Sequence, residues 1–92
     1  MAKAIATVKV MPSSPEIDLD ALENKIKEVI VGFVGECETK TTVTPVAFGL
    51  KQIEVIFVMD ENLGSPDPVA EKLEEFEEVN SAEIVDVRRA VG

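Results

Sequence analysis

The chain has 92 residues, of which 46% are hydrophobic and 29% charged, and its formal net charge is −9. These values predict one cytoplasmic domain over residues 1–92, without a signal peptide or membrane span. The negative charge favours a basic protein partner over nucleic acid. Because the chain has no histidine and only one cysteine, Cys37, a disulfide, a Cys/His metal site and histidine-dependent catalysis are excluded, and we expect an inert thiol and no cofactor.

The first predicted elements are a strand and a helix. Apolar residues alternate with others from Ala4 to Met11, which is the period of a half-buried strand. Two prolines end this strand, and Asp18 has the position and chemistry of a helix N-cap. The helix ends near Gly32 and Gly35. Its apolar residues recur at spacings of three and four, which predicts one buried stripe: Leu19, Leu22, Ile26, Val29, Ile30 and Phe33.

Two further strands follow, over residues 38–46 and 51–59. The first is rich in threonine, and Pro45 assigns it to the edge of a sheet because proline cannot donate a backbone hydrogen bond. The second is apolar on both faces, which indicates a central strand. Ile53, Val55, Phe57 and Met59 share one of these faces.

After a loop, Asp67 is the predicted cap of a second helix, with Pro68 at its first position and an end near Val79. The acidic run within this segment is interpreted as a solvated helix face. A last strand is predicted over residues 82–90. The order βαββαβ predicts an α+β, ferredoxin-like fold with a four-stranded antiparallel sheet and both helices on one face.

Phe48 lies between the second and third strands, where Gly49 permits a tight turn. From the residues alone, two interpretations stay open. Phe48 either turns inward and covers the end of the core, or it is an exposed aromatic anchor for a partner, with Lys51 supplying a charge beside it.

Arg88 and Arg89 stand together near the end of the last predicted strand. They are interpreted either as charges that prevent the edge strand from pairing with other sheets, or as contact residues. Strict alternation places Arg88 on the face of Ile84 and Asp86, where Asp86 partly offsets its charge. Arg89 is then expected to be an unpaired cation that reaches outward at the tip of the strand.

Three blocks of sequence resemble the archaeal translation elongation factor 1-beta family and the catalytic C-terminal domain of its eukaryotic counterparts. The blocks are Ile5–Pro12, Pro45–Lys51 and Ile84–Arg89, in the same order over essentially the whole chain. The resemblance implies a ferredoxin-like fold and a guanine nucleotide exchange factor for elongation factor 1-alpha, the GTPase that delivers aminoacyl-tRNA to the ribosome. It implies no bond-making chemistry.

The resemblance also assigns roles to single residues. The aromatic residue through which the family contacts the GTPase corresponds to Phe48, flanked by Pro45, Gly49 and Lys51. A lysine that reaches the Mg²⁺ region of the GTPase in eukaryotic members corresponds to Arg89, and this is a departure, because a guanidinium is planar and bulkier than an ammonium group. The factor is expected to be a monomer.

Other function classes remain as alternatives. A small regulatory or ligand-binding module would form a homodimer and bind a metabolite. An RNA-binding domain would place aromatic residues and cations on the open sheet face, whereas that face is expected to carry mostly Ile, Thr, Val, Glu and Gln. An enzyme that makes or breaks bonds ranks last, because no convincing nucleophile is present.

Overall fold

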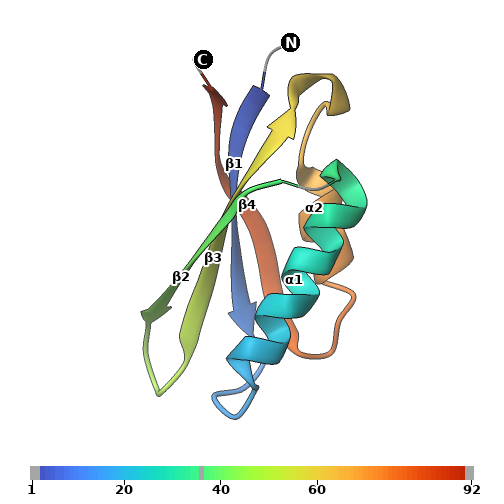
Figure 1. Cartoon of the computed structure of the whole chain (residues 1–92). Coiled ribbons are helices and arrows are strands. Elements are labelled where there is room, and N and C mark those ends of the chain that lie inside the picture. The colour runs from blue at the N-terminus through green and yellow to red at the C-terminus, as the bar shows by residue number, and fades with distance from the viewer. Residues whose placement is uncertain (1–2, 36, 91–92) are drawn as a thin grey trace.

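A computed structural model describes residues 3–35 and 37–90, and Figure 1 shows a twisted sheet with both α-helices on one face. The elements in chain order are β1 (Lys3–Pro12), α1 (Leu19–Val34), β2 (Thr39–Pro45), β3 (Lys51–Asp60), the 3-10 helix η1 (Glu61–Leu63), α2 (Asp67–Leu73) and β4 (Val79–Ala90). The strand order is β2-β3-β1-β4, and neighbouring strands are antiparallel. The predicted α+β, ferredoxin-like fold is confirmed, as is the edge position of the strand that ends at Pro45.

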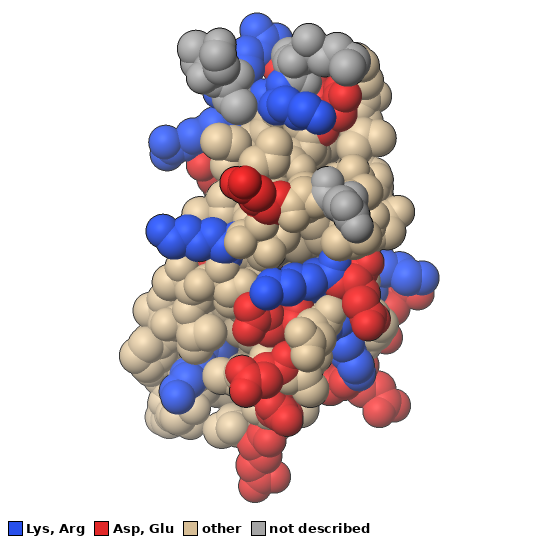
Figure 2. Space-filling model, viewed as in Figure 1, with Lys and Arg blue, Asp and Glu red and all other residues tan. Residues whose placement is uncertain are grey.

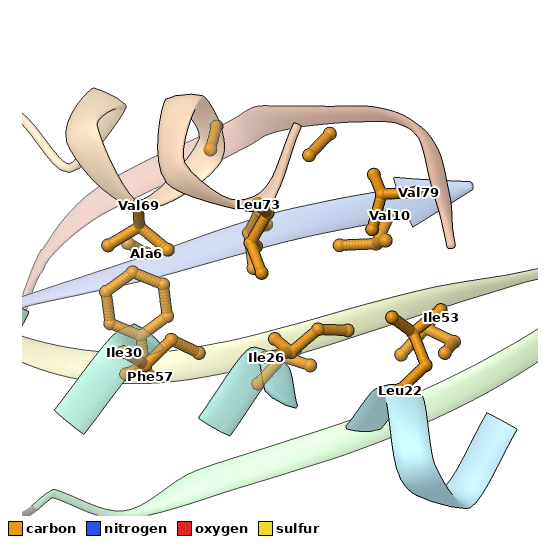
Figure 3. Packing of buried hydrophobic residues seen from close by; sticks show 14 of the residues in the cluster. Ala6, Val10, Leu22, Ile26, Ile30, Ile53, Phe57, Val69, Leu73 and Val79 are labelled. Atoms are coloured by element: carbon orange, nitrogen blue, oxygen red, sulfur yellow. The ribbon is translucent and has the colours of Figure 1, made fainter. Parts of the chain in front are cut away.

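The core lies between the helices and the central strands, as the alternation in β1 and β3 predicts. Their inward residues are buried to 7% exposure or less: Ala4, Ala6, Val8, Val10, Ile53, Val55, Phe57 and Met59. Figure 3 shows how side chains from α1 and α2, such as Ile26, Ile30, Val69 and Leu73, meet this layer. None of the described helices is long and apolar enough to cross a membrane.

Helix α1 begins where the sequence predicts. The carboxylate of Asp18 accepts hydrogen bonds from the backbone N–H groups of Asp20, at 3.0 Å, and Ala21, at 3.3 Å. These bonds satisfy two donors that have no partner within the first turn of a helix. At the other end, Gly35 has a positive φ of 82°, and its N–H donates to the carbonyl of Val31. The cap and the glycine therefore set both ends of α1.

Helix α2 is shorter than its apolar spacing predicts, since it ends at Leu73 rather than near Val79. Val79 instead begins β4, opposite Pro12 of β1. The five glutamates of this segment also disfavour a longer helix, which would stack like charges on successive turns and place them at its negative pole. The predicted cap, Asp67, is the first helical residue, and the hydroxyl of Ser65 accepts its backbone N–H at 3.1 Å.

Strand β4 contains a bulge that strict alternation did not predict. Val8 of β1 pairs with Ile84 and Thr7 pairs with Asp86, so Val85 has no residue opposite it. Ile84 consequently packs against the core on the helix-covered face. The prediction that placed Ile84 on the same face as Asp86 was therefore wrong, because the bulge adds one residue to the period of the strand.

Candidate partner-binding surface

The β2–β3 hairpin presents the first group of predicted site residues. Phe48 and Gly49 occupy its tip with φ angles of 60° and 78°, and the carbonyl of Ala47 accepts a hydrogen bond from the N–H of Leu50 at 3.1 Å. Two consecutive residues with positive φ are the pattern of a type I′ turn, whose twist matches that of the flanking strands. Such a turn directs the side chain at its tip away from the sheet.

The side chain of Phe48 is 95% exposed, which excludes the interpretation that it covers the end of the core. It is also the one non-glycine residue with a positive φ in the described ranges. A left-handed backbone costs a residue with a Cβ about 1 kcal/mol or more. Phe48 therefore has two unfavourable features in the free protein, a strained backbone and an aromatic ring in water. Neither is balanced by packing within the chain.

The residues around Phe48 form a compact group. Pro45 pairs with Lys51 at the base of the turn, and both are exposed. A Cβ placed on Gly49 would lie 3.8 Å from the Cβ of Pro15, in ordinary contact. The loop that follows β1 therefore lies beside Gly49. The structure brings together four of the six predicted site residues: Pro45, Phe48, Gly49 and Lys51.

Arg88 lies on the open face of the sheet, in the row of Ile5, its partner in β1. Its Nε is 2.8 Å from Oδ2 of Asp86, two residues earlier in β4. The expectation that Asp86 partly offsets the charge of Arg88 is confirmed. Because both side chains are well exposed, this pair adds little to folding stability.

Arg89 lies on the other face, in the row of Ala4, and its side chain is 74% exposed. The prediction that it is unpaired was wrong. Its Nε donates to Oε1 of Glu61 at 2.6 Å, and this hydrogen bond raises the pKa of Arg89. Arg89 therefore reaches outward with one edge of its guanidinium already bound to a carboxylate.

The hairpin and the arginine pair lie at opposite ends of the sheet, as Figure 1 shows for the hairpin and the C-terminal end of β4. Arg89 pairs with Ala4, which in turn pairs with Met59 near the end of β3, whereas the hairpin precedes Lys51 at its beginning. Met59 lies eight residues after Lys51 along the strand, or about 26 Å at 3.3 Å per residue. The predicted site is thus divided into two separate surfaces.

Most of the acidic residues lie in the two α-helices or in the segments next to them. On the face shown in Figure 2, acidic side chains gather over the lower half. Lys25 of α1 binds Glu78, which lies in the turn after α2, and this hydrogen bond lowers the pKa of Glu78. The ammonium group of Lys25 also lies 5.5 Å from the centre of the Phe76 ring. The remaining glutamates there, Glu71, Glu74, Glu75 and Glu77, are exposed to solvent.

Cys37 is half-buried and packs against the hydrophobic core. Within residues 3–35 and 37–90, no three Cys, Asp or Glu side chains lie together in a group that could hold a metal ion.

Glu61 is the residue that sequence reasoning missed. It follows the third strand in a loop, where no periodicity marks it. Its contact with Arg89 depends on topology, because β3 and β4 both run antiparallel to β1 and therefore both finish beside the first residues of β1. The predicted order of strands was therefore the only signal that could have placed the segment near Arg89.

Comparisons with known proteins agree on a family. Residues 5–90 match the model of the EF-1 guanine nucleotide exchange domain. An elongation factor 1-beta of Methanococcus maripaludis is 40% identical over 87 residues, which cover 95% of this chain and 97% of that protein. The protein of the same name from Methanosphaera stadtmanae is 40% identical, and the match covers 97% of this chain and 98% of that protein. The one from Methanocaldococcus jannaschii is 38% identical, and the match covers 98% of this chain and 100% of that protein.

A solved structure described as "BlrP1 BLUF" is similar in fold, with a TM-score of 0.58 and 10% sequence identity. The match covers all of this chain and 57% of that one. At this identity the similarity shows only that the arrangement of strands and helices recurs, because one architecture serves many functions.

Proposed function

Because this chain belongs to the family of EF-1 guanine nucleotide exchange domains, we propose that it promotes the release of GDP from elongation factor 1-alpha, so that GTP can rebind during translation elongation. The match over residues 5–90 is the observation that carries this proposal. The whole chain would act as a single exchange domain.

Exchange requires no covalent bond to be made or broken. The GTPase holds GDP through its phosphates and Mg²⁺, so a partner that moves a segment of the nucleotide site or brings a cation close to the ion weakens the nucleotide. By thermodynamic linkage, GDP and the factor then weaken each other's binding by the same ratio. The factor accelerates release, and the higher cellular concentration of GTP determines which nucleotide rebinds.

Phe48 is the anchor in this proposal. A ring that is 95% exposed at the tip of a hairpin loses little entropy on binding, since it has only two side-chain torsions and its backbone is fixed by the turn. Pro45 and Gly49 shape the turn, and Lys51 adds a cation beside the ring. Burial of the ring in a pocket of the GTPase would remove its exposed apolar surface from water.

Arg89 acts at the other end of the sheet, and the part of β3 from Lys51 to Met59, about 26 Å long, lies between it and the hairpin. Its guanidinium would enter the nucleotide site, while Arg88 contacts the GTPase from the opposite face of β4. The factor would therefore touch its partner at two separate places, one for affinity and one for displacement of the nucleotide.

Stopped-flow release of a fluorescent GDP from elongation factor 1-alpha tests this division. Phe48→Ala should require a much higher concentration of factor for half-maximal acceleration but should reach a similar maximal rate. Arg89→Ala should lower the maximal rate. Val31→Ala is a suitable control, because Val31 is exposed on α1 and belongs to neither surface.

Release at the uncatalysed rate in the presence of saturating wild-type protein would refute the proposed function. Unchanged kinetics for both variants would refute the assignment of the two surfaces. A pull-down provides a second criterion, because an exchange factor should retain the nucleotide-free GTPase better than the GDP-loaded form.

A further inference from the structure

The ion pair between Arg89 and Glu61 links two strands that are not neighbours. Arg89 belongs to β4, Glu61 follows β3, and β1 lies between these two strands in the sheet. The Nε–Oε1 distance is 2.6 Å, and the two side chains are 74% and 30% exposed. A charge-assisted hydrogen bond of this length holds the guanidinium over the start of β1.

Glu61 is the better fixed member of the pair. It is the first residue of η1, and the carboxylate of Asp60 caps this turn by accepting the N–H of Asn62 at 2.9 Å. The turn closes where the N–H of Gly64, at a φ of 80°, donates to the carbonyl of Glu61 at 3.1 Å. The backbone of Glu61 is therefore held from both sides, directly after a central strand. Its carboxylate is a defined point of attachment for Arg89.

Arg88 provides an internal comparison. Its carboxylate partner, Asp86, is two residues away in the same strand, so this pair forms from local sequence alone. Glu61 is 28 residues from Arg89, and their contact exists only in the folded sheet. Of the two arginines, only Arg89 is thus oriented by the tertiary structure.

We propose that Glu61 is a positioning residue, which orients Arg89 for its approach to the nucleotide site of the GTPase. This inference rests on the proposed function. An arginine at an exposed strand end samples many rotamers, and ordering it on binding costs entropy. The bond to Nε restricts that freedom in the free factor and leaves the two terminal amino groups of the guanidinium outside the bond.

The kinetic test compares Glu61→Gln with Asp86→Asn, which removes the carboxylate charge beside Arg88 instead. Glu61→Gln should lower the maximal rate of GDP release about three- to ten-fold, with little change in the half-saturating concentration. Asp86→Asn should leave the maximal rate unchanged, because it does not touch Arg89. In the Arg89→Ala background, Glu61→Gln should have no further effect, since a positioning residue acts only through the side chain that it orients.

Three kinetic results would overturn the proposal. The first is an unchanged maximal rate of GDP release in Glu61→Gln. The second is a faster maximal rate, which would mean that Glu61 holds Arg89 away from the GTPase. The third is a double variant in which the effects of Glu61→Gln and Arg89→Ala on this rate multiply independently. Urea unfolding of each variant, followed by circular dichroism, verifies that the rates are measured on folded protein.

A second measurement needs no partner. The 15N relaxation of the Nε–H group of Arg89 should report restricted motion in the wild type and free motion in Glu61→Gln, while Asp86→Asn should change only the signal of Arg88. Equal mobility of Arg89 in wild type and Glu61→Gln would overturn the inference. If Arg89 is restricted but the wild type does not accelerate GDP release, the proposed function fails instead, and the role of Glu61 with it.

Discussion

Replacing Phe48 with asparagine should make the free protein more stable and its complex weaker. Phe48 has a φ of 60° and is followed by Gly49, so the variant would contain Asn-Gly, a pair strongly preferred in two-residue hairpin turns. Because the ring is 95% exposed, its removal sacrifices almost no packing. The backbone strain is relieved at the same time.

The size of both effects follows from the structure. A residue with a Cβ in the left-handed region costs about 1–2 kcal/mol, and asparagine tolerates this region better, so we expect a gain of about 1 kcal/mol in the free energy of unfolding. For a domain of this length, that gain corresponds to a rise of about 4–8 °C in Tm. An aromatic anchor contributes about 2 kcal/mol or more to binding, so the affinity for elongation factor 1-alpha should fall about 30-fold.

Urea and thermal unfolding followed by circular dichroism measure the first effect, since the chain has neither Trp nor Tyr to serve as a fluorescent probe. Isothermal titration of the nucleotide-free GTPase measures the second, with Val31→Ala as the control. A loss of more than about 1 kcal/mol of stability in Phe48→Asn would refute the conclusion that Phe48 packs against nothing. An unchanged affinity would refute its role as the anchor.

Three other substitutions test the structure more broadly. Gly49→Ala should lower the unfolding free energy by about 1 kcal/mol, because alanine is strained at a φ of 78°. The loss should not exceed this strain, since the new Cβ meets no clash. Urea titration measures the change, and an unchanged unfolding free energy would contradict the turn geometry. The hydrogen bond from Lys27 lowers the pKa of Glu23, so the pair adds stability above the ordinary pKa of 4.5, and this contribution disappears as the pH falls through the lowered value. Glu23→Gln should therefore flatten the acid side of the stability profile, and a profile identical to that of the wild type would exclude this linkage. Phe57→Ala should lower the unfolding free energy by about 3–5 kcal/mol, since Phe57 is fully buried, and calorimetry should detect a markedly lower Tm; a loss under about 1 kcal/mol would indicate a different core.

The sequence predicts the central strands well because burial repeats at the period of the structure. In β3, Ile53 and Phe57 are inward residues, and both are fully buried. The ends of α2 were less predictable, since Val79 fits the spacing of the helix stripe and also the first position of β4. Pairing with Pro12 across the sheet decides between these two states, and a sequence pattern carries no information on such a distant contact.

The candidate site was predicted unevenly for a similar reason. The turn at Phe48 and Gly49 was predicted because glycine leaves a local signature, whereas the direction of the Phe48 ring stayed open from the residues alone and is decided by the structure. The partner of Arg89 was not identified, because Glu61 meets it only across the end of β1. Contacts within a few residues of each other can be inferred from the chain, whereas those that join three strands require the folded sheet.

The bulge in β4 determines which arginine faces which side. In a regular ladder that starts from Ile84 opposite Val8, Asp86 would point inward, and every later residue would exchange faces. Arg88 would then take the row of Ala4, and Arg89 would turn to the open face. Because Val85 is an extra residue with no partner in β1, the alternation of side chains between the two faces shifts by one residue after it. Ile84 and Arg89 can therefore both lie on the helix side. The irregularity at Val85, four residues earlier, thus determines on which face of the sheet the guanidinium of Arg89 lies.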